Sequence, residues 1–161
     1  MKLRILSASL TLTTLLTLVI YAGGIKLEGI KCVMNPDEQV QHLSFVEYKG
    51  GKVFFCCDHC SQPFVEKVSK DEILAATANA QLVATNQAKQ KHSPLSGGAY
   101  NAGTEIKVAG AEIGFCCSNC QSQAQSLSGK KQLLALFGDA AFKKAGFKVT
   151  PTKKYFSLPA Y

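Results

Sequence analysis

The sequence FFCCDHC at residues 54–60 decides how this chain is interpreted, and a related sequence, GFCCSNC, occurs at residues 114–120. The two stretches are 60 positions apart, and the same offset aligns KC at residues 31–32 with KH at residues 91–92. Because a side chain that can bind metal precedes each cysteine cluster at the same distance, we interpret the chain as an internal duplication. A period of this length predicts two small modules rather than a solenoid.

A β-hairpin is predicted immediately before each cysteine cluster. In the first repeat, residues 43–48 and 52–56 contain β-favouring side chains, and the Lys-Gly-Gly sequence between them supplies the positive φ angles of a tight turn. In the second repeat, residues 104–108 alternate polar and apolar side chains, an Ala-Gly pair forms the turn, and residues 112–116 return. Each hairpin therefore ends at its cysteines.

A helix is predicted after each cluster. Apolar side chains recur at helical spacing from Pro63 onward, and again over residues 132–147, where a Gly-Asp pair marks a break. Residues 81–85 fit either a strand or a continuation of the first helix. The repeated unit is thus a ligand, a hairpin, a cysteine knuckle and a helix, which gives an α+β fold.

The repeats divide the chain into two modules and two terminal segments. The first module is expected at residues 25–80 and the second at residues 81–149. Residues 150–161 hold two prolines and are expected to form a C-terminal tail. Each module is small enough to need a metal ion or disulfides for stability.

The N-terminus has the pattern of a secretory signal peptide. Lys2 and Arg4 precede an uncharged, largely apolar run at residues 5–21, and the small residues Ala-Gly-Gly follow it. Cleavage is expected after Gly24, so that residues 1–24 are removed. The alternative is a retained membrane anchor, because the run approaches the roughly 17 to 20 residues of a membrane-spanning helix. Both interpretations place the body of the protein outside the cytoplasm, in the periplasm or secreted.

Composition argues against several classes of function. The chain has 18 lysines and arginines against 11 acidic residues, a net charge of +7, but Arg4 is the only arginine and the lysines are spread along the sequence. Proteins that bind nucleic acids specifically favour arginine and clustered basic faces, so we expect no nucleic-acid partner. No Ser/His/Asp set, paired carboxylates or phosphate loop is evident, so we expect no enzyme.

The cysteines are suited to metal binding. Thiolate sulfur is a soft ligand for zinc and copper(I), and structural zinc is commonly held by four cysteines or by three cysteines and one histidine. The exchange of Cys32 for His92 at the aligned position keeps a zinc ligand but removes a disulfide partner. The expected ligands are Cys32, Cys56, Cys57 and Cys60 in the first repeat and His92, Cys116, Cys117 and Cys120 in the second.

Two alternatives stay open. Cysteines of exported proteins usually form disulfides, which would make the chain a stapled module that recognises an extracytoplasmic partner. The odd count of seven cysteines and the His92 exchange count against this alternative. The Cys-x-x-Cys pairs at residues 57–60 and 117–120 are also typical of thiol–disulfide exchange proteins, although the βαβ sheet of thioredoxin-type sites is not predicted.

With these features, the chain resembles the YHS and TRASH families of small metal-binding modules. Their shared pattern is an early Cys, a hairpin that ends in aromatic-aromatic-Cys, three residues, a Cys, and a Phe that opens a helix. In the first repeat, Cys32, residues 54–60 and Phe64 match this pattern. In the second, residues 115–120 match it, with His92 at the early position and Ala124 in place of the Phe.

The resemblance covers residues 32–70 and 92–137. It implies a treble-clef-like fold for each module and a role in binding, sensing or trafficking zinc, copper or other heavy metals. In the family pattern Cys56 and Cys60 are the ligands, so Cys57 and Cys117 are additional. The metal ion is the expected partner, with zinc as the first expectation and copper as the alternative; the sequence identifies no protein partner.

Overall fold

The structure is a computed structural model that describes residues 25–151. The expected signal peptide or anchor at residues 1–24 lies outside the described residues, as does almost all of the expected tail. Within the described part of the chain, no helix has both the length and the apolar character needed to cross a membrane.

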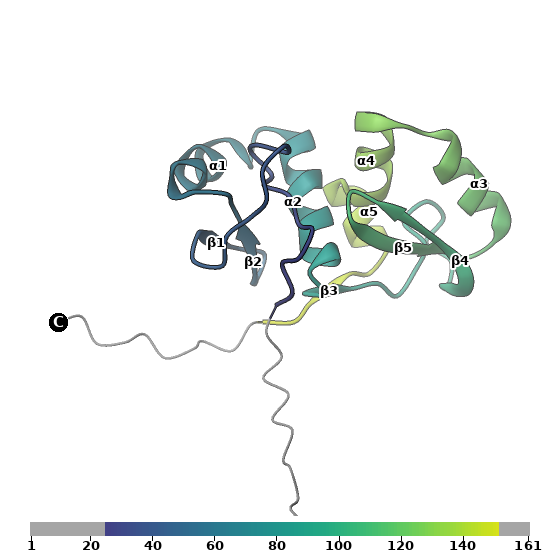
Figure 1. Cartoon of the computed structure of the whole chain (residues 1–161). Helices are drawn as coiled ribbons and strands as arrows, with labels where there is room; N and C mark the ends of the chain where they lie inside the picture. The colour runs from purple at the N-terminus through teal and green to yellow at the C-terminus, as the bar shows by residue number, and fades with distance from the viewer. Residues whose placement is uncertain (1–24, 152–161) are drawn as a thin grey trace, which may run out of the picture.

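The first half of the chain forms a hairpin followed by short helices (Figure 1). Strand β1 (Phe45–Tyr48) pairs antiparallel with β2 (Gly51–Phe54). The connecting residues Lys49 and Gly50 have φ angles of 50° and 84°, as the predicted tight turn requires. A 3-10 turn, η1 (Asp58–Cys60), and helix α1 (Ser61–Lys67) follow.

The second half repeats the hairpin and adds three helices. Strand β4 (Asn101–Val108) pairs antiparallel with β5 (Ala111–Phe115), and the loop residues Ala109 and Gly110 again have positive φ angles, 49° and 80°. The helices are α3 (Ser118–Ser126), α4 (Gly129–Phe137) and α5 (Asp139–Lys144). The predicted break between α4 and α5 is confirmed at Gly138, where a Cβ atom would lie 2.6 Å from the Leu134 carbonyl oxygen.

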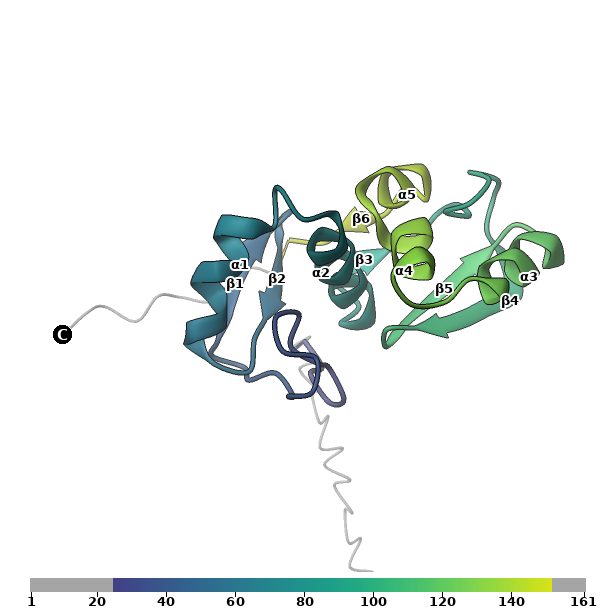
Figure 2. The same ribbon diagram turned by 90° about the horizontal axis from the view of Figure 1, so that it is seen from above.

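Helix α2 (Glu72–Ala84) lies between the two halves in both views (Figures 1 and 2). Its N-terminus is capped by Asp71, whose carboxylate accepts from two backbone N–H groups of the first turn, both at 3.0 Å. The helix continues to Ala84, so residues 81–84 extend the helix rather than forming a strand. It contacts β2 on one side and β5, α4 and α5 on the other. The expected module boundary after residue 80 therefore falls inside α2.

The two halves share one hydrophobic core. Phe55 and Phe64 from the first half and Phe115 and Phe137 from the second belong to the same buried cluster, together with Leu82 of α2. A two-stranded hairpin alone is marginal in water, so packing against α2 supplies apolar burial that neither hairpin has by itself. The last described strand also ties the halves together, because β6 (Lys148–Val149) pairs with β3 (Ala88–Lys89) beside the end of α2.

Glutamine side chains cover the free edge of each hairpin. The Gln81 side chain donates to the Phe54 carbonyl at 3.0 Å and accepts from the Phe54 N–H at 2.7 Å, and Gln87 makes the same pair of bonds with Lys52. Gln90 does so with Gly114 of β5. Because these amides replace the ladder of a missing strand, they protect edges that would otherwise be open and fix the strands that lead to the cysteines.

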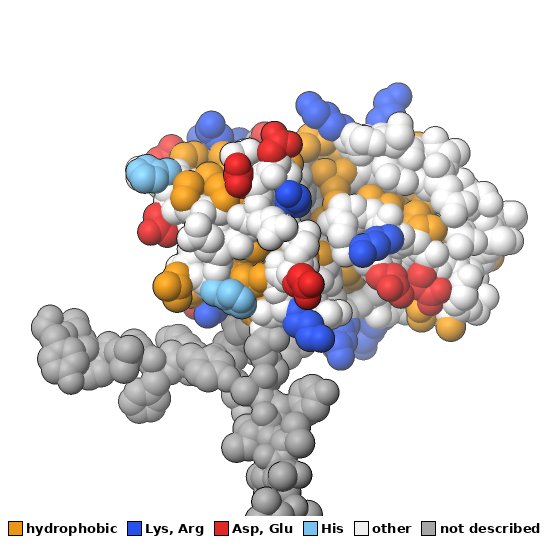
Figure 3. All heavy atoms as spheres, in the orientation of Figure 1, with side chains coloured by type: hydrophobic (Ala, Val, Ile, Leu, Met, Phe, Trp, Pro, Cys, Tyr) orange, Lys and Arg blue, Asp and Glu red, His pale blue; other side chains and the backbone are white. Residues whose placement is uncertain are grey.

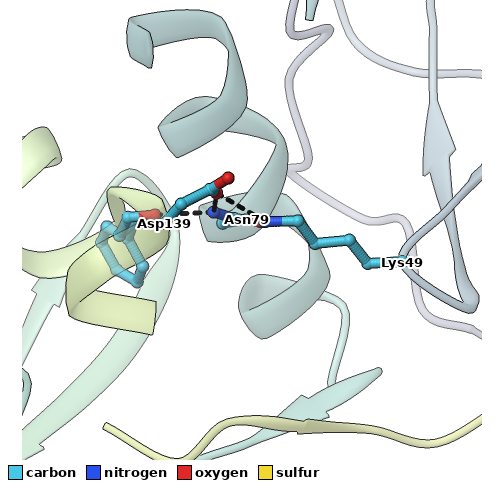
Figure 4. Close-up of polar contacts among 4 residues, drawn as sticks. Lys49, Asn79 and Asp139 are labelled. Carbon is cyan, nitrogen blue, oxygen red and sulfur yellow. Dashed lines mark hydrogen bonds and ion pairs between the residues drawn. The ribbon is translucent and has the colours of Figure 1, made fainter. Parts of the chain in front are cut away.

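A polar network centred on the buried Asn79 joins the first hairpin, α2 and α5 (Figure 4). Asn79 is fully buried and donates to the Phe137 carbonyl at 2.8 Å and to Asp139 at 2.9 Å, and it accepts from Lys49 at 3.0 Å. Lys49 also pairs with Asp139 at 2.5 Å. The turn of the first hairpin is thereby attached to the start of α5.

On the face drawn in Figure 3, basic and acidic side chains are interspersed, with hydrophobic side chains between them. This distribution is that of an ordinary solvated surface.

Candidate metal centres

The first cysteine cluster is built on the knuckle that follows β2. Cys57 has extended backbone angles (φ −161°, ψ 164°), and the chain then turns through η1, where the Cys60 N–H donates to the Cys57 carbonyl at 3.2 Å. This turn directs the side chains of Cys56, Cys57 and Cys60 toward one another. The hairpin and the helix α1 thus meet at the sulfur atoms.

Four sulfur atoms gather at this knuckle. The Sγ atoms of Cys56 and Cys57 are 3.9 Å apart, and Cys60 Sγ lies 3.7 Å from each of them. Cys32 completes the cluster, because its Sγ lies within 4.8 Å of those of Cys56 and Cys60. Zinc–sulfur bonds of about 2.3 Å in a tetrahedron place the sulfurs about 3.8 Å apart. The edges among Cys56, Cys57 and Cys60 therefore have the spacing of a zinc tetrahedron, whereas Cys57 Sγ is not within 4.8 Å of Cys32 Sγ.

Cys32 comes to the knuckle from a separate segment. Lys31 forms an antiparallel bridge with Gln39, and the Cys32 N–H donates to the Glu38 carbonyl at 3.0 Å. The Cys32 side chain is 1% exposed, so it closes the buried side of the cluster.

The environment of Cys32 favours its thiolate. Burial alone would raise the pKa of the Cys32 thiol, but backbone N–H groups of Cys56, Met34 and Asn35 donate to its sulfur and bring the pKa below its ordinary value. A set of backbone donors around one sulfur stabilises the charge that a metal-bound thiolate carries.

The Cys56 and Cys60 thiols resist ionisation in the absence of an ion. Burial raises the pKa of the Cys60 thiol, and the neighbouring Cys56 thiol raises it further. The pKa of Cys56 is raised for the same reason, with Cys32 as its neighbour. An incoming metal ion must displace these protons, so binding here weakens as the pH falls.

The second cluster has the same local geometry at the start of α3. Cys117 has the backbone angles of Cys57 (φ −162°, ψ 167°). The Cys116 Sγ lies 3.6 Å from the Sγ atoms of both Cys117 and Cys120, and all three sulfurs are within 4.8 Å of one another. These three predicted residues are brought together as a compact thiol triad.

The segment that precedes the second cluster differs from the prediction by one residue. His92 pairs with Ala99 in an antiparallel bridge, and the Ser93 N–H donates to the Gly98 carbonyl at 2.8 Å. By this main-chain pattern the position matching Cys32 is occupied by Ser93, and His92 matches the residue before it.

The loop lengths explain this difference. The first bridge spans residues 31–39 and the second spans residues 92–99, so the second loop is one residue shorter. Equivalent residues of the two repeats are therefore 60 positions apart at the knuckle and 61 positions apart before the loop. An alignment of the repeats without a gap pairs Cys32 with His92 instead of Ser93.

The His92 ring lies away from the sulfurs. It is exposed and sits beside Gly146, where an added Cβ would be 3.0 Å from His92 Cδ2. Among residues 25–151, neither sulfur group includes a histidine. Seven of the eight expected ligands therefore lie in the two clusters, and His92 does not.

Two serines that were not among the expected ligands lie at the second cluster. Ser96 Oγ is 3.1 Å from Cys116 Sγ, and this contact is the largest of those that lower the pKa of the Cys116 thiol. Ser93 is fully buried, and its hydroxyl makes no hydrogen bond of normal geometry, although it helps to lower the pKa of the Cys116 thiol. Ser93 can be identified from the sequence only if the repeats are aligned with a one-residue gap, because the loop of the second repeat is one residue shorter than that of the first.

All seven cysteines are free thiols in the structure. Comparison of the chain with protein families, with curated proteins and with solved structures gives no match.

Proposed function

We propose that this protein binds one metal ion at each cysteine cluster and that the ion is zinc. The observation that supports this most strongly is the sulfur spacing of the first cluster. Three distances of 3.7 to 3.9 Å among Cys56, Cys57 and Cys60 match the edge of a zinc tetrahedron. The buried Cys32 thiol adds a fourth sulfur from another segment.

Zinc is favoured over copper for the first cluster because its four cysteines can supply four thiolates, the usual set of a closed structural zinc site. Cys57 would have to move toward Cys32 when the ion binds, since these two sulfurs are not within 4.8 Å of each other. In this proposal Cys57 is a ligand, beyond the pair that the resemblance implies. The second cluster supplies the three ligands Cys116, Cys117 and Cys120.

We further propose that the two halves are treble-clef-like repeats related to YHS and TRASH modules. The matched features are local: a hairpin closed by two residues with positive φ, a cysteine in the same extended conformation, and a helix that starts beside the last cysteine. The main-chain bridges before each cluster add a fourth matched feature.

The biological setting is proposed from the sequence. A signal peptide or anchor at residues 1–24 would place the metal sites outside the cytoplasm, and scattered acidic residues without a catalytic set favour a binding role over catalysis. We therefore propose metal trafficking, sensing or structural binding outside the cytoplasm, without a nucleic-acid partner.

The test is the metal content and free-thiol count of the protein, made from its full-length chain and purified without chelator. We expect about two zinc ions per chain and thiols that react only after a chelator is added. The double change Cys56→Ser/Cys60→Ser and the single change Cys120→Ser, each of which leaves two thiolates, should each lose one ion. His59→Ala is the matched control, because His59 lies in the first knuckle but outside the sulfur group, and it should keep both ions.

Absence of metal together with oxidised cysteines would contradict the proposal and favour the disulfide scaffold. Reduction of insulin disulfides that depends on Cys57 or Cys60 would instead favour the thiol–disulfide exchange function.

A further inference from the structure

We infer that the two clusters differ in kind: in the first, Cys32 supplies a fourth sulfur that closes the site around zinc, and the second is an open three-thiolate site from which zinc exchanges. The inference rests on the proposed metal binding and concerns the fourth coordination position. In the first cluster Cys32 fills this position, whereas in the second the matching residue is Ser93.

A serine hydroxyl does not replace a thiolate as a zinc ligand. It is neutral near pH 7, and protein zinc sites are built from cysteine, histidine and carboxylate side chains. With three protein ligands a zinc ion takes its fourth ligand from solvent, as zinc sites with an open position do. The second cluster therefore binds zinc together with an exogenous ligand, a water molecule or a small thiol.

The burial of Ser93 shows that this position belongs to the site. The side chain is fully buried, yet its Oγ has no hydrogen-bond partner of normal geometry. A buried polar atom without a partner costs stability, so an ion or its water ligand beside Cys116 would satisfy a group that the protein leaves unpaired.

The second cluster is also the more accessible one. Cys117 is exposed, whereas the first cluster has no exposed cysteine and is closed by Cys32. The backbone comes close to the second cluster at Gly98, where an added Cβ would lie 3.0 Å from Cys116 Cβ. On this side the cluster therefore faces main chain and solvent, and no fourth protein ligand is present there.

The experiment measures the rate at which a chromogenic chelator removes zinc from the full-length protein. We expect two phases of equal size, a fast one from the second cluster and a slow one from the first. Because loss of an outer-shell partner alone weakens metal binding about 10- to 100-fold, loss of a direct ligand should separate the two rates by at least about tenfold.

Reciprocal substitutions assign the phases. Ser93→Cys supplies the missing thiolate and should convert the fast phase into a slow one. Cys32→Ser should convert the slow phase into a fast one. His92→Ala is the control for the alternative ligand and should leave both rates and the zinc count unchanged.

Equal release rates for both ions that Ser93→Cys does not alter would overturn the inference while leaving metal binding intact. Loss of one zinc in His92→Ala would also overturn it, because His92 would then be the fourth ligand. Failure of the proposed function is distinguishable, since a protein without zinc at either cluster gives no release phase. The rates of unmodified protein and of Cys32→Ser decide the question even if Ser93→Cys folds poorly.

Discussion

At the scale of single residues, the buried Asn79 side chain has a hydrogen-bond partner for both its donor and its acceptor. The amide oxygen accepts from Lys49 in the first hairpin, and the amide nitrogen donates to Phe137 and Asp139 at the junction of α4 and α5. Buried polar groups are stabilising only when they are paired in this way, so Asn79 fixes how α5 and the first hairpin sit against α2.

Substitution of Asn79 by alanine should lower the free energy of unfolding by about 1 to 3 kcal/mol, because the Phe137 carbonyl loses its buried side-chain donor. Urea denaturation measures the change. Thr77→Ala on the same helix is the control, since its hydroxyl bonds only to a carbonyl of its own helix, and it should change stability by less than about 0.5 kcal/mol. A similar loss in both variants would contradict the role assigned to Asn79.

Asp139 makes part of the stability depend on pH. Partial burial would raise the pKa of its carboxyl group, but hydrogen bonds from Lys49 and Asn79 and the charge of Lys49 bring the pKa below the ordinary value of 3.8. A lowered pKa means that the contribution is complete above the unfolded-state value and is lost as the pH falls through the folded-state value.

We therefore expect Asp139→Asn to be less stable than the unmodified protein at pH 7, by less than about 1 kcal/mol because the side chain is 65% exposed. The difference should disappear when denaturation is measured well below pH 3.8. A difference that is constant with pH would show that the Asp139 charge has no part in it.

At the scale of secondary-structure elements, each cysteine knuckle is positioned by the strand before it, and each strand is held on its free edge by a glutamine. Gln81 binds both main-chain groups of Phe54, two residues before Cys56. Gln90 binds both main-chain groups of Gly114, two residues before Cys116. The two amides are therefore equivalent supports for different clusters.

This equivalence gives a paired prediction. Gln81→Ala should speed zinc release from the first cluster only, and Gln90→Ala should speed release from the second only. Each should also reduce stability by about 1 to 3 kcal/mol for each buried main-chain group left unpaired, with the larger loss for Gln81, which is the more deeply buried of the two. Release kinetics with a chelator make the measurement, and an equal effect of either change on both clusters would contradict it.

At the scale of the whole molecule, the two halves share one hydrophobic core, and each carries one cysteine cluster. The core runs through α2 from the aromatic residues of the first half to those of the second. The pairing of β3 with β6 links the segment after α2 to the segment after α5. Small modules gain stability from such shared burial.

Leu82→Ala should consequently destabilise both halves together, by about 2 to 5 kcal/mol, because Leu82 is fully buried in the shared core. Hydrogen exchange of backbone amides in β2 and β5 measures the two halves separately. We expect the same loss of protection in both strands. Loss confined to β2 would indicate two independently stable modules.

The sequence by itself determined the local structure of this protein. The paired turn residues at 49–50 and 109–110 specify hairpin loops because their conformations need positive φ, and the cysteine spacing brings three sulfurs together within one knuckle. Both features depend on residues a few positions apart, and they were predicted for that reason. The helix break at Gly138 is likewise a local feature, specified by the Gly-Asp pair at that point of the sequence.

The tertiary structure alone decided how these local units combine. The position of α2 in a shared core depends on apolar contacts between distant segments, which periodicity does not specify, so the expected boundary after residue 80 falls within a helix. Which residue stands beside the three knuckle cysteines, Cys32 or Ser93, depends on the main-chain register of a loop whose first strand lies about 24 residues before the knuckle. One residue fewer in the second loop moves Ser93 into that position and turns His92 toward Gly146.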